Sequence, residues 1–269
     1  MSRSRRSRKS AFLASLAAAG VIAVPGTAHG TGAPAGAGGD GLWAVATIEP
    51  GRSGVVEVRG FGAEALGAGS VLTLSAPART RVTGAPYAGL GYRGAVVRGG
   101  GSGTYTFGGA SAAGWKDLAF PFVLSLAPDA EPGTRLPDCT LVLRDAKGTV
   151  RQRGTCSVTV GLPAPTLSGP ASGVPLGATP RASGTAYPGA QVTVRDALEQ
   201  EVCAATAAPD GAWSCVPGFA LPTGTGRLQA TATLNGVSAL SEQIDIMVSG
   251  AGAAQKDTVS NGGGGRLPG

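Results

Sequence analysis

The sequence predicts an all-β chain in which two antiparallel β-sandwiches follow one another. Short runs rich in Val, Leu, Thr and aromatic residues recur between residues 42 and 248, separated by Gly, Pro and Asp. Such spacing is typical of sandwich strands and their turns. No window keeps an apolar period of 3.6 residues long enough to predict a helix. Four cysteines, all beyond residue 138, add the pattern of a disulfide-bonded, exported protein.

The first 30 residues predict a signal peptide. Five basic residues (Arg3, Arg5, Arg6, Arg8 and Lys9) precede an apolar run over residues 11–24. A transmembrane helix needs about 20 apolar residues, so this run suits a signal peptide better than an anchor. Small residues at 26–30 allow two cleavage sites. The pair Arg5-Arg6 leaves a twin-arginine route open, although the lack of an apolar residue just after it favours general export.

The basic excess of the chain belongs to this leader. The whole sequence has 22 basic and 16 acidic residues, and subtracting the leader's five leaves 17 against 16. A near-neutral mature chain argues against nucleic acid as a partner. We therefore expect a secreted or extracellular protein, loosely associated with a cell wall at most, with no membrane span after processing and no nucleic-acid partner.

The cysteines predict two local disulfides. Cys139 and Cys156 flank a turn at residues 145–148, and Cys203 and Cys215 flank a turn at residues 208–211. If each turn closes a hairpin, the members of each pair lie almost opposite one another, near bonding distance. The second pair then lies too close in sequence to connect two sheets.

Residues 31–40 form a flexible lead-in, and residues 41–161 a first sandwich. Its strands are expected at LWAVATI, VVEVRG, SVLTLSA, TYTFG, LAFPFVLSLA, CTLVLRD and CSVTV. Between Gly84 and Gly109 lie ten glycines in 26 residues, which predict long loops and a ragged edge strand. The G-x-G-x-x-G at residues 89–94 lacks the strand and helix of a dinucleotide site and follows from the glycine content.

Residues 162–165 form a linker, residues 166–248 a second sandwich of about seven strands, and residues 249–269 a disordered tail. The second sandwich resembles the bacterial immunoglobulin-like modules of secreted and wall-associated proteins. The resemblance lies in Gly184-Thr185-Ala186, Pro188-Gly189-Ala190 with Val192-Thr193-Val194, and Asp210-Gly211-Ala212-Trp213. Trp213 is expected in the core beside the disulfide. Residues 132–145 weakly repeat residues 188–196, which predicts a diverged sandwich of similar kind for the first domain.

The sequence offers little for catalysis, and we expect no enzyme, cofactor or metal site. His29, the only histidine, lies at the cleavage region. Without it, serine and cysteine triads and most zinc sites are excluded from the mature chain. Asp145, Asp196 and Asp210 stand where a turn favours a carboxylate that binds its own backbone.

These features predict a non-catalytic structural, adhesive or interaction protein of the bacterial cell envelope or medium. The alternative is a carbohydrate-binding accessory protein, in which Tyr87, Tyr92, Tyr105 and Trp115 stack on a sugar. The other interpretation of these aromatics is that they fill a small core, and we favour it over sugar stacking. The partner stays open between a cell-wall or extracellular polysaccharide and another surface protein. If the protein binds a partner, residues 84–116 are expected to make the contact.

Overall fold

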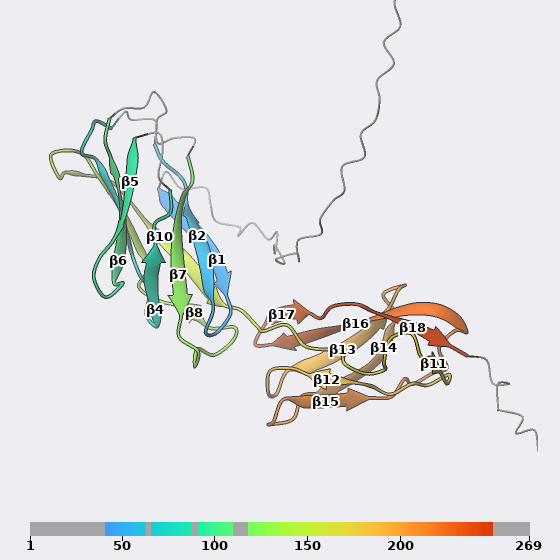
Figure 1. The fold of residues 1–269 in the computed structure, drawn as a ribbon. Helices are drawn as coiled ribbons and strands as arrows, with labels where there is room; N and C mark the ends of the chain where they lie inside the picture. Colours follow the sequence, from blue (N-terminus) through green and yellow to red (C-terminus); the bar gives the residue numbers. More distant parts are fainter. Residues whose placement is uncertain (1–40, 63–65, 88–90, 110–117, 250–269) are drawn as a thin grey trace, which may run out of the picture. The chain divides into compact units, whose positions relative to one another are not determined.

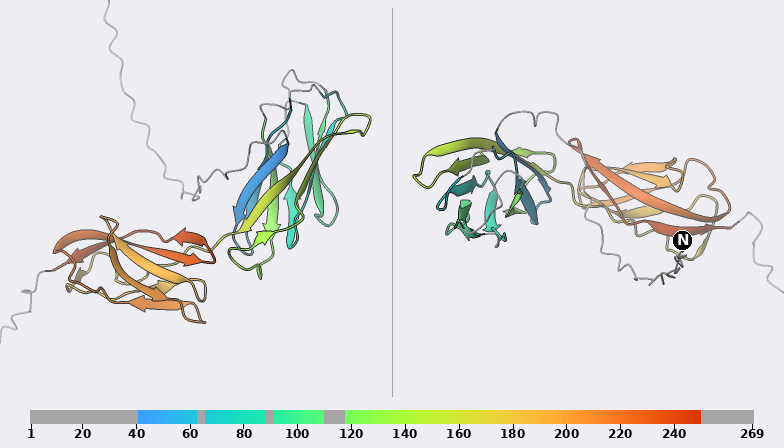
Figure 2. Two further views of the ribbon diagram at one scale, coloured as in Figure 1. Left: turned by 180° about the vertical axis from the view of Figure 1, so that it is seen from behind. Right: turned by 90° about the horizontal axis from the view of Figure 1, so that it is seen from above.

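The computed structural model describes residues 41–62, 66–87, 91–109 and 118–249. The predicted signal peptide, lead-in and most of the tail lie outside these ranges. Within them the chain forms strands and loops and no helix, so no helix there could span a membrane. Two separate hydrophobic cores form, one from residues 42–160 and one from residues 162–248. The predicted all-β class is confirmed (Figures 1 and 2).

The first sandwich has a seven-stranded and a three-stranded sheet. The larger sheet runs β1-β10-β9-β3-β6-β5 with β8 beside β10, and the smaller runs β2-β7-β4. The bounds are β1 (Leu42–Ile48), β2 (Ser53–Val58), β3 (Val71–Ser75), β4 (Thr80–Gly84), β5 (Tyr92–Val96), β6 (Ser102–Phe107), β7 (Phe120–Leu126), β8 (Arg135–Leu136), β9 (Thr140–Arg144) and β10 (Val150–Val160).

The two sheets of the first sandwich meet through side chains of alternate residues. On β6, Gly103, Tyr105 and Phe107 are buried, and the ring of Tyr105 lies 4.9 Å from that of Phe122 on β7 of the smaller sheet. A Cβ atom at Gly103 would lie 2.9 Å from the Phe122 ring and from Val82, so a larger residue here would clash with the facing sheet.

The second sandwich has a six-stranded sheet, β11-β18-β16-β13-β14 with β17 beside β16, and a two-stranded sheet, β12-β15. Val192, Val194, Leu228 and Ala230 are buried, as their alternation predicted. Leu162, expected in the linker, is buried in this core. The bounds are β11 (Pro175–Leu176), β12 (Ala182–Thr185), β13 (Gln191–Asp196), β14 (Glu201–Thr206), β15 (Ala212–Cys215), β16 (Gly224–Leu234), β17 (Val237–Leu240) and β18 (Ile244–Val248).

Strand direction corrects one prediction, since neither sandwich is purely antiparallel. β1 pairs in parallel with β10 along its whole length, and β11 pairs in parallel with β18 over two residues. In both sandwiches the first strand therefore lies beside the last. A hairpin cannot join such strands, because parallel neighbours need a long crossover. Apolar alternation is the same in either direction, so the sequence pattern did not distinguish them.

Each sandwich contains a hairpin turn of the same type, and this similarity extends the weak repeat seen in the sequence. In RDAKGT the Asp145 carboxylate accepts hydrogen bonds from the amides of Lys147 and Thr149, each at 2.9 Å. In RDALEQ the Asp196 carboxylate accepts from Leu198 and Gln200 at 2.8 and 2.9 Å. The arginine before each Asp donates to the carbonyl of the fourth turn residue, at 2.9 Å from Arg144 and 2.7 Å from Arg195.

The turns differ at that fourth residue, which is left-handed in both. It is Gly148 with φ +81° in the first sandwich and Glu199 with φ 60° in the second. A left-handed conformation costs a residue with a Cβ atom about 1–2 kcal/mol, while glycine returns part of this through the entropy of the unfolded chain. The second turn therefore carries strain that the first does not.

We expect Glu199→Gly to raise the free energy of unfolding of the second sandwich by about 0.5–1 kcal/mol. Gly148→Ala is the matched reverse change and should destabilise the first sandwich by about 1 kcal/mol. Urea denaturation of the full processed chain, followed at tryptophan and tyrosine wavelengths, measures both. A loss of stability in the Glu199→Gly variant would contradict the inference of strain.

Candidate functional site

The aromatic residues proposed for sugar stacking are mainly core residues. Tyr105 is 0% exposed and Tyr92 is 5% exposed, so neither offers a ring face to a ligand. Burial, together with the nearby Tyr87, raises the pKa of Tyr92, and burial likewise raises that of Tyr105. Their assignment as ligand contacts is wrong, because Tyr92 is buried at the start of β5 and the alternation of β6 turns Tyr105 inward. The core-filling interpretation holds for these two residues.

Tyr105 has a structural role that residue type alone did not reveal. Its hydroxyl donates to the carbonyl of Pro121 at 2.5 Å and accepts from the amide of Tyr87 at 3.0 Å. Pro121 lies in β7, the middle strand of the smaller sheet, where a missing N–H normally breaks the ladder. On the β4 side the register ends at Val123, before Pro121 is reached. A side chain of the opposite sheet thus replaces the strand partner.

We expect Tyr105→Phe to destabilise the first sandwich by about 2 kcal/mol, because it leaves two backbone groups without their hydrogen-bond partner. Tyr87→Phe is the matched control, since it keeps the Tyr87 amide and removes only the hydroxyl of a half-buried side chain. Chemical denaturation of both variants measures the difference. Equal stabilities of the two variants would show that the Tyr105 hydroxyl contributes nothing.

The other two proposed contacts are Tyr87 and Trp115. Tyr87 is half-buried, with its ring centroid 5.4 Å from that of Phe120 and 6.1 Å from that of Tyr105. Among the described residues it is the one member of the proposed set that is not fully buried. Trp115 lies outside the described residues.

The structure joins Cys139 with Cys156 and Cys203 with Cys215, at Cα separations of 5.2 and 5.9 Å. In the first pair, a bulge between Val150 and Gln152 shifts the β9–β10 register by one residue. The shift places Cys156 directly opposite Cys139, and their backbones are hydrogen-bonded. A register counted from the turn alone places Cys139 and Cys156 one position out of alignment.

The second disulfide corrects a prediction, because it connects two sheets. Cys203 lies in β14, whose ladder partner is β13, whereas Cys215 lies in β15, which pairs with β12. Residues 208–211 do form a turn, with the Asp210 carboxylate accepting from Ala212, but the chain passes there from one sheet to the other. Trp213 is buried on the same strand face as Cys215, as expected.

Several carboxylates of the described residues serve turns and surface ion pairs. Burial opposes ionisation of Asp145, but the amides of Thr149 and Lys147 and the guanidinium of Arg151 together lower its pKa. A hydrogen bond and the positive charge of Arg79 lower the pKa of Asp129. No group of three or more His, Cys, Asp or Glu side chains within the described ranges could hold a metal ion.

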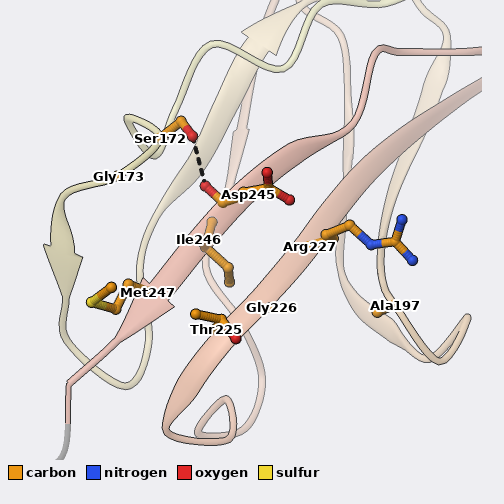
Figure 3. Close-up of a pocket in the computed structure, with 9 residues that line it drawn as sticks. All are labelled: Ser172, Gly173, Ala197, Thr225, Gly226, Arg227, Asp245, Ile246 and Met247. Carbon is orange, nitrogen blue, oxygen red and sulfur yellow. Dashed lines mark hydrogen bonds between the residues drawn. The ribbon is translucent and has the colours of Figure 1, made fainter. Parts of the chain in front are cut away.

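A groove that sequence reasoning missed lies on the second sandwich, with a volume of about 610 Å³. It is lined by residues 225–227 of β16, by residues 245–247 of β18, and by Ser172, Gly173 and Ala197 (Figure 3). We call it the β16–β18 groove. Arg227 and Asp245 are register partners across its two strands, and Ser172 donates to the Asp245 carbonyl at 2.9 Å.

No protein-family model and no curated protein matches the chain. Among solved structures it is similar to the BSP domain of a biofilm associated protein, with 17% identity and a TM-score of 0.28, over 78% of this chain but only 30% of that one. It is also similar to the C-terminal domain of the Streptococcus agalactiae AgI/II polypeptide BspA, with 9% identity and a TM-score of 0.26, over 75% of this chain and 94% of that one. A third similar structure, the FN1–FN3 domains of chicken CNTN1, has 10% identity and a TM-score of 0.30, over 78% of this chain and 68% of that one. The fold described above therefore rests on the strand pairing itself.

Proposed function

We propose that this chain is an exported, non-catalytic structural or adhesive protein of the bacterial cell envelope or medium. The observation that carries the proposal is that each of the two cores has its own disulfide, one within a sheet and one between sheets. Such bonds persist in oxidising compartments and limit the unfolding of small domains. The resemblance to immunoglobulin-like modules and the predicted signal peptide support the same conclusion.

The placement of the carboxylates also supports this role. Asp145, Asp196 and Asp210 are occupied by backbone amides of their own turns, and Asp129 pairs with Arg79 at 2.7 Å. These four carboxylates are therefore not free to act as a general acid or base. The alternative role is sugar binding through the first-domain loops. Tyr92 and Tyr105 are buried in the core and cannot contribute to it.

The test uses the full processed chain, labelled with a fluorophore at its terminus and incubated with envelope preparations of the organism that encodes it. We expect saturable retention that survives washing in physiological salt and is lost when the chain is reduced and alkylated in denaturant. The alkylated chain is the matched control, because it has the same composition without the fold. Equal retention of native and alkylated chains would contradict a folded adhesive module.

A further inference from the structure

We propose that the β16–β18 groove of the second sandwich binds a neutral oligosaccharide. The inference rests on the proposed adhesive function, because it names the kind of partner that an adhesive protein would bind. It moves the predicted contact from residues 84–116 to residues 172–247. The volume of the groove, about 610 Å³, is in the range of small-molecule sites.

The polar groups in the groove suit hydroxyl groups that both donate and accept hydrogen bonds. Arg227 presents several donors in one plane, the Asp245 carboxylate presents acceptors, and Thr225 offers a hydroxyl. All three lie on the outer face of the sheet, on two adjacent strands (Figure 3). In Figure 3 the Arg227 guanidinium extends toward Ala197 and away from Asp245, so the donor and the acceptor can bind different hydroxyls of one oligosaccharide.

Hydrogen bonds between side chains hold Arg227 in place at one edge of the groove. The guanidinium of Arg227 donates to the Gln243 side-chain oxygen at 3.2 Å. The Gln243 amide donates to the Gln229 side chain at 3.5 Å, and Gln229 donates to the Ser241 carbonyl at 2.9 Å. The chain of contacts ends on backbone, so the Arg227 side chain is partly ordered before a ligand arrives. Such preorganisation lowers the entropic cost of binding.

The groove also has an apolar part and a balanced charge. Met247 is 44% exposed and Ala197 lines the opposite side, which gives the C–H face of a sugar ring a surface to pack on. One arginine and one aspartate line the groove, so its formal charge is zero. A polyanion would instead need clustered basic residues. The charge therefore favours a neutral glycan over an anionic one.

The strand edge beside the groove argues against an extended peptide as the occupant. A peptide that adds to a sheet needs unpaired backbone groups along the edge strand. On β18 the Asp245 carbonyl already accepts from Ser172, and Met247 and Val248 pair with β11. Side chains of the sheet face, rather than its backbone edge, are what the groove presents.

The test titrates the full processed chain with cellohexaose, maltohexaose, tetra-N-acetylchitotetraose and, as an anionic probe, heparin, and follows backbone amide shifts by NMR. We expect saturable binding of at least one neutral oligosaccharide, with shifts centred on residues 225–227 and 245–247. Arg227→Ala and Asp245→Asn should each weaken it about tenfold or more. Arg181→Ala removes an exposed arginine that bonds Ser214 on the other sheet, and serves as the matched control with unchanged affinity.

Several outcomes would overturn the proposal. The first is that no neutral oligosaccharide binds at millimolar concentration, and the second is that the shifts are confined to the first sandwich. The third is that the Arg227→Ala and Arg181→Ala variants bind with equal affinity. The fourth is that heparin binds more tightly than the oligosaccharides and that Asp245→Asn does not weaken its binding. Binding of an extended Val/Thr peptide at these residues in place of every oligosaccharide would also overturn it. Retention on envelopes that persists in the Arg227→Ala variant would leave the adhesive function standing while this groove fails.

Discussion

Phe120→Ala should destabilise the first sandwich by about 3–5 kcal/mol, the cost typical of removing a buried aromatic side chain. Phe120 is fully buried, and its ring centroid lies between 4.9 and 5.4 Å from those of Phe61, Tyr87, Tyr92 and Tyr105. Truncation therefore removes one partner from four ring pairs and leaves a cavity between the sheets. Because domains are stable by only about 5–15 kcal/mol, much of the stability of this sandwich would be lost.

The measurement is urea denaturation of the full processed chain, with near-ultraviolet circular dichroism to follow the tyrosines of the first core. Phe219→Ala is the matched control, because Phe219 is 37% exposed and should cost well under 1 kcal/mol. If the two variants lost similar stability, Phe120 would not be the centre of the aromatic core.

The buried positions of the strands could be predicted because alternation encodes them. Leu141, Leu143, Val158 and Val160 lie in the core as the sequence indicates. The turn aspartates were predictable for the same local reason, since Asp145, Asp196 and Asp210 bind amides two or four residues further along. Both signals depend only on residues close in sequence.

The errors arise where a residue's partner lies far away in sequence. The turn at residues 208–211 is local, but whether Cys203 and Cys215 share a sheet depends on β12 and β13, which precede them. The burial of Tyr105 had a local signal that was overlooked, namely the alternation of Gly103, Tyr105 and Phe107 within β6. Its glycine-rich surroundings suggested loops instead, although β5 does form the predicted edge strand.

The groove had no signal in the sequence. Its lining comes from residues 172–173, 197, 225–227 and 245–247, which belong to ordinary strands and turns and form no motif. Only the antiparallel register of β16 and β18 brings Arg227 opposite Asp245. A pattern that predicts strands says which residues face outward, but not which outward residues become neighbours.

Removing the inter-sheet disulfide should have the largest effect on the second sandwich. Cys203 and Cys215 are separated by 12 residues and Cys139 and Cys156 by 17. Loop-closure entropy assigns about 3 kcal/mol to each bond. Cys203→Ala with Cys215→Ala should therefore lower the melting temperature of this small sandwich by roughly 15 °C. Calorimetry of the full processed chain measures it, with Cys139→Ala and Cys156→Ala as the matched pair that should shift the first sandwich alone.

The two disulfides should also differ in how fast a thiol reductant reaches them. Cys139 and Cys156 are both buried within one sheet, whereas Cys215 is half-buried at the end of β15. Thiol–disulfide exchange needs a thiolate to approach a sulfur atom, so access limits the rate in the folded protein. Without denaturant we expect dithiothreitol to open Cys203–Cys215 first, detected by alkylation and peptide mass spectrometry. Earlier labelling of Cys139 or Cys156 would mean that the β9–β10 hairpin opens more readily than the junction between the sheets of the second sandwich.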